Sequence, residues 1–371
     1  MSFSLEHPTR RAFAAVPLLA AAASPAQSTT TLSLDGVRRD MLAYCEGMRD
    51  TGGPYGCYRG GPGKRTDLYS SCDIAILRTL MGEDLARTLT PEQRTQWIAH
   101  ITSYVDRSDP PYDGSYSDTH GHSKLHANGM VLSALGALGG RQIYPVRLYD
   151  AFRRPDRIAA WLDRIDWSRQ WRASHLFWGG MICFSLSRHC TPAWLDRVFA
   201  WLDANLDERT GWWRKGVPHS DRHQPLGGSV HILPLYEHHH RKFPYPERVI
   251  DSVLALQLES GRWQEMASPH VMGYLELDAL YALALMQQHA PGYRHADIQR
   301  SAGRYGSLAI RYYREHSAEL YRLHPHNALA AGGTFGLLSR MAPKMFPASN
   351  KWTDIFSDPR FYNTRAVEAE G

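Results

Sequence analysis

Apolar residues recur along most of the chain with the three-to-four-residue spacing of helices, and the alternating pattern of strands is scarce. Six of the predicted helices carry one charged face, which is typical of helices exposed to solvent on one side. Several of them begin at a Pro, Asp or Thr, which are common helix-start residues. These six helices span residues 34–48, 90–107, 154–165, 191–207, 245–260 and 296–316.

Six further helices are rich in small residues and apolar on nearly every side, which is typical of helices buried all round. Strict alternation of the two kinds indicates a repeat architecture whose units bury their faces on their neighbours. The pattern therefore predicts an all-α fold and, more narrowly, an (α/α)6 toroid over residues 33–345. An open solenoid alternates in the same way but gives no reason for inner helices so apolar and glycine-rich. The predicted inner helices span residues 67–82, 126–140, 174–189, 226–240, 274–289 and 326–341.

The turns that follow the outer helices repeat a motif. The stretch "LALQLESGRW", which ends at Trp263, places a Gln, a turn Gly and a Trp after an outer helix, and "LDERTGWW" and "SDPPYDGSY" are looser copies. This motif resembles the QW-type repeat of prenyltransferase and squalene-cyclase toroids, and polysaccharide lyase and glycoside hydrolase toroids use similar turns. The resemblance implies a toroid fold rather than terpenoid chemistry. The DxDD run of squalene-type cyclases and the zinc ligands of protein prenyltransferases are both missing from the sequence.

The two ends of the chain differ from the helical repeats. Arg10 and Arg11 precede an alanine-rich apolar run and a small-x-small site at residues 24–26, so residues 1–27 predict an export signal. The stretch "TRRAF" resembles a twin-arginine signal, which implies a periplasmic or secreted protein. No later stretch approaches the roughly 18 uninterrupted apolar residues of a membrane helix, so no membrane span is expected. The polar tail over residues 346–371 is expected to pack on or near the toroid.

The amino-acid composition of the chain limits the kinds of binding partner that are expected. The 371 residues include 43% hydrophobic residues, enough for a sizeable core, and the net charge of +5 includes no block of Lys or Arg typical of a nucleic-acid arm. We therefore expect no nucleic-acid partner. The five cysteines form no CxxC pair, which argues against a zinc ribbon or redox motif and favours buried thiols. Pairing of Cys57 with Cys72, or of Cys183 with Cys190, stays open for an exported protein.

The connections from outer to inner helices carry the candidate chemistry. In a toroid these connections lie at one end, so their residues converge on one cavity. All six contribute aromatic residues, which stack on sugar faces, and every connection after the first contributes histidine. This composition predicts an oligo- or polysaccharide partner. The expected substrate-binding residues are Tyr58, Arg59, Asn128, Arg172, Trp178, Trp212, Trp213, His223, Trp263, His270, Tyr274, His324 and His326.

Hydrolysis of a glycosidic bond requires two carboxyl groups, one protonated and one ionised. The candidates are Asp73, Asp118 and Glu276. Asp73 lies within an otherwise apolar helix, where partial desolvation raises the pKa of a carboxyl and suits it to act as the acid. The number of acidic residues in the connections places a glycoside hydrolase slightly ahead of its competitor, a polysaccharide lyase.

Elimination on a uronic-acid glycan instead requires a cation or amide for the uronate, and a His or Tyr to move protons. The stretch "HGHSKLHANG" supplies His122 and His126, Tyr116 lies in the same connection, and His175 lies in the next one. A terpenoid-processing toroid and a noncatalytic glycan- or lipid-binding toroid are further alternatives. No cofactor is assigned, although the four-residue spacing of His122 and His126, repeated by His219 and His223, leaves a metal site open.

Overall fold

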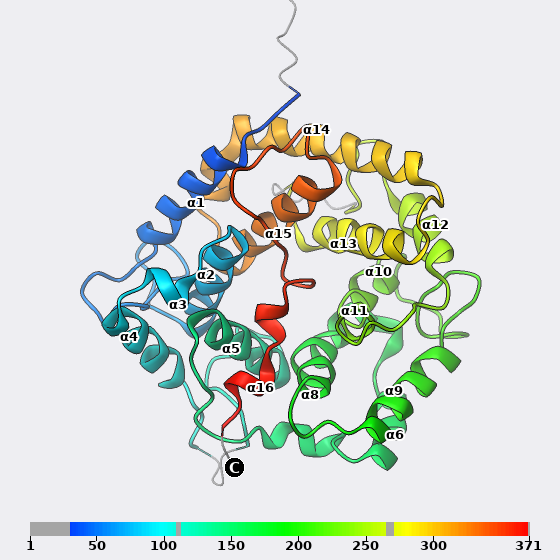
Figure 1. Cartoon of the computed structure of the whole chain (residues 1–371), viewed down its shortest axis with the longest axis horizontal. Helices are drawn as coiled ribbons and strands as arrows, with labels where there is room; N and C mark the ends of the chain where they lie inside the picture. Colours follow the sequence, from blue (N-terminus) through cyan, green and yellow to red (C-terminus); the bar gives the residue numbers. More distant parts are fainter. Residues whose placement is uncertain (1–29, 109–112, 265–270, 370–371) are drawn as a thin grey trace, which may run out of the picture. The chain divides into compact units, whose positions relative to one another are not determined.

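The computed structural model describes residues 30–108, 113–264 and 271–369 (Figure 1). The predicted export signal lies outside the described residues. Thr31–Gly371 form one compact unit. Within its described part the only extended pairings are isolated bridges, which confirms the prediction of an all-α chain. The helices are α1 (Leu34–Gly47), α2 (Leu68–Leu80), α3 (Leu85–Thr88), α4 (Pro91–Thr102), α5 (Lys124–Leu138), α6 (Ile158–Asp163), α7 (Gln170–Ala173), α8 (Cys183–Ser185), α9 (Pro192–Ala204), α10 (Gln224–Ser229), α11 (Leu233–His238), α12 (Pro246–Leu256), α13 (Tyr274–His289), α14 (His295–Leu320), α15 (Pro325–Met341) and α16 (Thr364–Val367), with the short helices η1 (Arg147–Ala151), η2 (Pro155–Arg157), η3 (Trp167–Arg169), η4 (Phe177–Ile182) and η5 (Pro359–Tyr362).

The helices with a charged face lie outside the apolar ones. In Figure 1, α1, α4, α9, α12 and α14 follow the periphery of this unit, and α2, α5, α8, α13 and α15 lie nearer its centre. Helix α2 packs against α15 on one side and α5 on the other, and α13 packs against α15. The first and last apolar helices of the chain are therefore neighbours.

Two of the predicted inner helices are interrupted. The stretch 226–240 forms α10 and α11 rather than one helix, because Pro234 lacks the N–H that a continuous helix needs at that position. The stretch 174–189 contains the wider π-helical turn η4 before α8. Both interruptions fall in helices that contribute to the cavity described below.

The recurring turn has a structural basis. Its glycine adopts a positive φ in each of the turns 56–58, 114–116, 211–213 and 261–263, and the aromatic residue two positions later is buried. A Cβ on Gly211 would lie 2.6 Å from Cγ2 of Val249 on the next outer helix, so glycine also permits close packing there. The turn aromatics consequently belong to the core between repeats.

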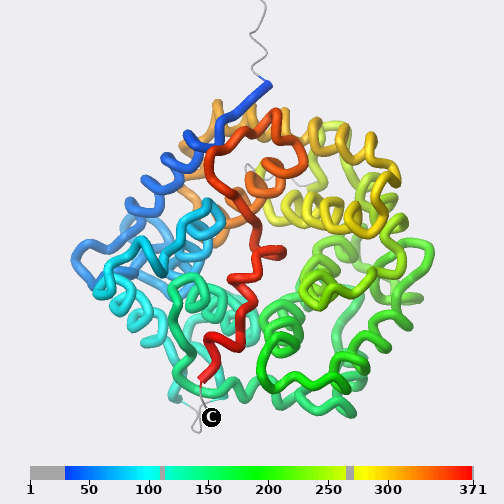
Figure 2. Tube along the Cα trace, in the orientation of Figure 1, coloured from blue at the N-terminus to red at the C-terminus, as the bar shows by residue number. Residues whose placement is uncertain are grey.

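The C-terminal tail crosses the middle of the view in Figure 2. Its backbone N–H at Thr353 donates to the carbonyl of Leu80 at 2.9 Å, and Ser133 Oγ donates to the carbonyl of Phe361 at 3.1 Å. These contacts connect the tail to the end of α2 and to the interior of α5. All five cysteines are free thiols, four of them buried, as the composition favours.

Candidate functional site

A cavity of about 410 Å³ collects residues from several apolar helices and from the tail. Six of its lining residues are histidines, and no Asp, Glu, Lys or Arg of the described residues lines it. Its chemistry therefore rests on imidazole and aromatic groups. The lining residues are His120, His122, His126, Met130, Trp171, His175, Trp178, His231, Tyr274, His326, Asn327, Ile355 and Phe356.

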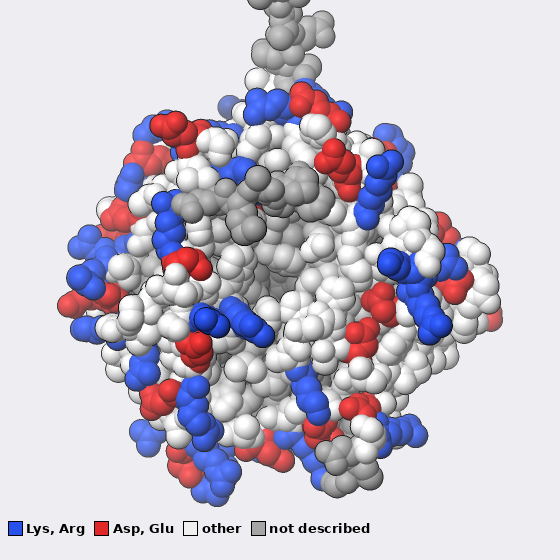
Figure 3. All heavy atoms as spheres, turned by 180° about the vertical axis from the view of Figure 1, so that it is seen from behind, with Lys and Arg blue, Asp and Glu red and all other residues white. Residues whose placement is uncertain are grey.

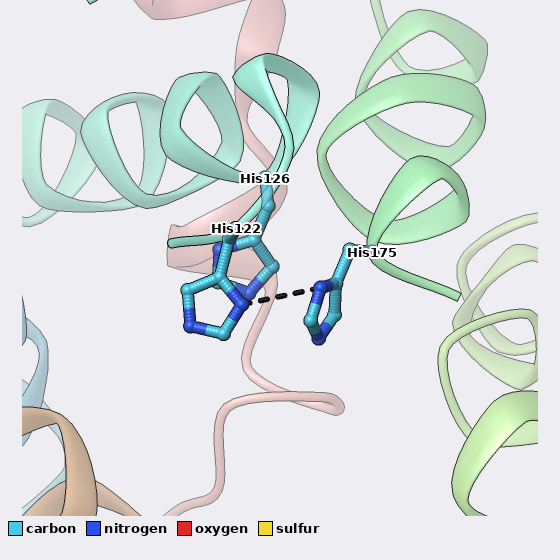
Figure 4. A group of neighbouring side chains, drawn as sticks. All are labelled: His122, His126 and His175. Carbon is cyan, nitrogen blue, oxygen red and sulfur yellow. Dashed lines mark hydrogen bonds between the residues drawn. The ribbon is translucent and has the colours of Figure 1, made fainter. Parts of the chain in front are cut away.

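Three of these histidines converge. His122 precedes α5, His126 lies in its first turn, and His175 lies just before η4 (Figure 4). The Nδ1 atoms of His122 and His175 are 3.1 Å apart, and the rings of His122 and His126 stack with centroids 4.3 Å apart. One nitrogen from each of the three rings lies within 4.8 Å of the other two. We call these residues the histidine triad.

Glycines set the spacing of the triad. A Cβ on Gly129 of α5 would lie 2.6 Å from the Cα of Gly179, and a Cβ on Gly179 would collide with the carbonyl of Leu125. Without side chains at these positions, α5 and η4 approach with their backbones in contact. That contact holds His126 and His175 close together from segments far apart in the sequence.

Tyr69 on α2 fixes the orientation of one triad ring. Its hydroxyl lies 2.9 Å from Nδ1 of the buried His126, and the two rings are nearly parallel. This contact leaves Nε2 of His126 as the ring nitrogen available to a ligand. Ser123 caps α5 by accepting a hydrogen bond from the backbone of His126, which places the histidine at the start of the helix.

A second arrangement pairs a carboxyl group with a cavity histidine. Asp73 on α2 is fully buried, and its Oδ1 lies 3.0 Å from Nδ1 of His326 on α15. The hydroxyl of Tyr274 donates to the carbonyl of His326 at 2.6 Å. The histidine is thus held from both sides, with Asp73 behind it and its Nε2 free of the Asp73 contact.

Burial dominates the protonation of these groups. It lowers the pKa of His122 to about 4 and those of His175 and His326 to about 3, with neighbouring imidazoles adding to the effect. It also raises the pKa of Asp73, as the position of this residue in an apolar helix predicts. At neutral pH the cavity therefore presents uncharged imidazoles.

His324 differs from these groups because the effect of a nearby carboxylate on its pKa outweighs the effect of burial. Although desolvation lowers the pKa of His324, its contact with Asp67 raises it overall. Its Nε2 also lies 3.2 Å from Ser70 Oγ, and its ring lies 4.3 Å from that of His120. His324, which contacts His120 without lining the cavity, is thus more easily protonated than the histidines of the lining.

The other predicted carboxylates point elsewhere. Asp118 accepts hydrogen bonds from the backbone N–H groups of Leu68 and His120, which organises the loop before α5. Glu276 is buried and pairs with Arg262 at 3.1 Å. In the described part of the chain, Asp73 is the one of the three predicted carboxyl groups with a hydrogen bond to the ring of a cavity histidine.

Several predicted residues of the connections lie in the protein core or in surface pairs. Tyr58, Trp213 and Trp263 are the turn aromatics described above and are fully buried. Tyr116 has the same place in its turn and donates to Gln142, away from the cavity lining. The remaining placements are as follows: Arg59 pairs with Asp50, Asn128 donates to Tyr149, Trp212 is buried in its turn, His223 lies near Asp221, and His270 lies outside the described residues.

A second cavity of about 940 Å³ shares His122 and His175 with the first. Arg164, Arg169 and Arg172 line it, with Asp166 as the one acidic lining residue among those described. The histidine-lined cavity therefore borders a positively charged groove. On the face shown in Figure 3, the middle is hollowed, charged residues of both signs lie around it, and some Lys or Arg side chains reach close to the hollow.

Sequence reasoning missed His231, Ile355 and Phe356. His231 follows the first half of an interrupted helix, and its Nδ1 lies 3.0 Å from the carbonyl of Gly227. The two tail residues reach the cavity only because the tail crosses the centre of this unit. No local pattern in the sequence indicates either contact.

Comparisons of the chain with protein-family models, curated proteins and solved structures find no match. Within the described residues, no helix combines the length and the hydropathy needed to cross a membrane. The function is accordingly argued from the geometry of the cavity.

Proposed function

We propose that this protein is an exported carbohydrate-active enzyme that cleaves a uronic-acid polysaccharide by β-elimination. The observation that carries the proposal is the buried Asp73–His326 pair at a cavity lined by neutral histidines. An imidazole that is uncharged at neutral pH and held by a carboxyl group can accept a proton at its free ring nitrogen. Arginines of the adjoining groove supply charge complementary to an acidic polymer.

The arrangement supports elimination better than hydrolysis. Hydrolysis requires two carboxyl groups on opposite sides of the scissile bond, separated by roughly 5 to 9.5 Å. Asp118 and Glu276 are engaged in backbone and Arg262 contacts, so neither forms such a pair with Asp73 across the cavity. The acidic residues of the connections, whose number favoured a hydrolase, therefore do not form a catalytic pair of carboxyl groups.

In the proposed reaction His326 Nε2 takes the proton from the carbon next to the uronate carboxylate. The electron pair of that C–H bond forms a carbon–carbon double bond, and the bond to the leaving sugar oxygen breaks. The imidazolium formed on His326 then gives its proton to the leaving oxygen, so that the imidazole is uncharged again at the end of the step. Trp171 and Tyr274 of the cavity wall provide aromatic faces for the sugar rings.

The proposal includes the (α/α)6 toroid and export through a twin-arginine-like signal. Alternating peripheral and central helices, the contact of α2 with α15 and the recurring glycine turns support the toroid. Arg10, Arg11 and the apolar run that follows support export. The mature chain would then meet its polysaccharide in the periplasm or outside the cell.

The proposal is tested with signal-free protein on a panel of neutral and uronic-acid polysaccharides, following reducing ends and the ultraviolet absorbance of unsaturated products together. Reducing ends and ultraviolet absorbance should both increase, and only with a uronic-acid polysaccharide. His326→Ala should lower kcat by about 10²- to 10⁴-fold, whereas Arg169→Ala should mainly raise KM. His239→Ala, which alters a histidine bonded to Ser185 outside the cavity, is the matched control.

Other outcomes decide between the alternatives. Reducing ends without ultraviolet absorbance mean hydrolysis and overturn the proposal. If the protein binds the glycan but forms no product, a noncatalytic binding toroid is favoured. If neither product nor glycan binding is detected, a terpenoid or lipid ligand is favoured.

A further inference from the structure

We infer that His122, His126 and His175 bind a divalent transition-metal ion, for which Zn²⁺ is the best match. Three histidines are a known protein ligand set of catalytic zinc sites, which keep a fourth position open. The triad nitrogens lie within 4.8 Å of one another, and all three residues line the cavity. The fourth position would face that cavity, where a substrate group or water could occupy it.

The distances within the triad suit a small tetrahedral ion. Zn–N bonds of about 2.0–2.1 Å imply nitrogens roughly 3.3 Å apart in a tetrahedral site. The Nδ1 atoms of His122 and His175 are 3.1 Å apart and face each other. Figure 4 shows the His126 ring beside this pair, so a modest side-chain rotation would complete the set.

The surroundings of the triad also match a metal site. Metal-binding histidines usually engage their other ring nitrogen in a hydrogen bond that fixes the ring. Nδ1 of His126 has this contact with Tyr69, which leaves Nε2 for the ion. The Gly129–Gly179 contact holds the two histidine-bearing segments at a fixed separation.

The other cavity histidines are less suited as ligands. His326 and His231 also have one ring nitrogen engaged, by Asp73 and by the carbonyl of Gly227, as His126 has by Tyr69. Their position distinguishes them, because neither belongs to the group of converging nitrogens. His231 therefore provides a matched control within the same cavity.

The ion would also supply a positive charge that the described lining of the inner cavity lacks. Bound to the triad it would lie near His326, whose ring centroid is 5.1 Å from that of His122, and would neutralise the uronate carboxylate during proton removal. This role rests on the proposed function, whereas metal binding by the triad does not.

The test uses the signal-free protein after dialysis against a chelator. Titration with Zn²⁺ should show one site, and Co²⁺ should give the visible absorbance of a tetrahedral complex. His122→Ala and His175→Ala should each weaken Zn²⁺ binding by more than 100-fold, and Tyr69→Phe by about tenfold. His231→Gln should bind like the wild type, and thermal unfolding monitored by circular dichroism verifies the fold of each variant.

Absence of a stoichiometric site, binding that survives in His122→Ala and His175→Ala, or equal loss in His231→Gln would overturn the inference. Tight Zn²⁺ binding without glycan cleavage would support the metal site and refute the proposed function. Elimination at full rate in metal-free protein would instead refute the role of the ion while preserving the lyase.

Discussion

At the scale of single residues, two acids in the same helix have opposite environments. Glu276 on α13 pairs with Arg262, whereas neither carboxyl oxygen of Asp278 has a hydrogen-bond partner among the described residues. Burial, and then the charge of Glu276, raises the pKa of Asp278 above 3.8. We therefore expect Asp278 to be a source of instability at neutral pH rather than a catalytic group.

Replacing Asp278 with Asn should raise the free energy of unfolding at pH 7 by about 1–2 kcal/mol, because the ionisable group no longer has to be buried. A raised folded-state pKa stabilises the protein below the unfolded-state pKa, and this contribution is lost as pH rises through the folded-state value. Urea denaturation of Asp278→Asn should accordingly show a smaller decline in stability from pH 4 to pH 8 than the wild type.

Glu276→Gln is the matched control, since it removes the buried negative charge that pairs with Arg262. It should destabilise by about 3–5 kcal/mol at pH 7. Equal destabilisation by Asp278→Asn would show that Asp278 has a polar partner in the folded protein.

Single residues also show which features of the site could be predicted from the sequence and which could not. The sequence predicts that His122 and His126 lie close together, although His122 precedes α5 instead of sharing a helical face with His126. The apolar surroundings of Asp73 predict its raised pKa. The partner of Asp73 is His326, 253 positions away, and the pairing depends on how α2 and α15 rotate against each other. Composition of a connection likewise cannot distinguish a cavity residue such as Trp178 from a core residue such as Trp263.

At the scale of helices, small residues determine how closely segments approach. Gly179→Ala should push η4 away from the carbonyl of Leu125 and destabilise the protein by about 1–3 kcal/mol or more. The same shift should separate His175 from His126 and weaken Zn²⁺ binding. Thermal unfolding and Zn²⁺ titration measure the two effects on one sample.

Gly303→Ala is the control for this prediction. Gly303 lies within α14, and an added Cβ would meet nothing within 4 Å. Alanine should stabilise this helix by up to about 1 kcal/mol. Equal effects of the two substitutions would mean that the contact between α5 and η4 tolerates expansion.

Helix periodicity predicted the alternation of charged and apolar helices but not their interruptions. The break between α10 and α11 depends on Pro234, whose missing N–H prevents one continuous helix even in a strongly apolar stretch. The π-helical turn η4 has no comparable sequence marker, because it depends on packing against α5. His231, which lies at the α10–α11 break, was missed for the same reason.

At the scale of the whole molecule, the tail joins apolar helices that are distant in sequence. Trp352, Phe361 and Tyr362 are buried, Glu368 pairs with Arg188 at 2.9 Å, and Phe356 forms part of the cavity wall. Burial of each large apolar side chain contributes about 1.5–3 kcal/mol. The tail is therefore expected to be an integral part of the folded unit.

A chain ending at Ser349 should consequently unfold at a markedly lower temperature than the full-length protein and bind a hydrophobic dye through the newly exposed core. Phe356→Ala should have a milder effect on stability but enlarge the cavity, which would raise KM for a glycan that contacts this wall. Lys351→Ala, at an exposed position of the same segment, should leave both quantities unchanged. A shortened chain that melted within a few degrees of the full-length protein would show that the helices close around the cavity without the tail, and the tail residues would then affect only the ligand.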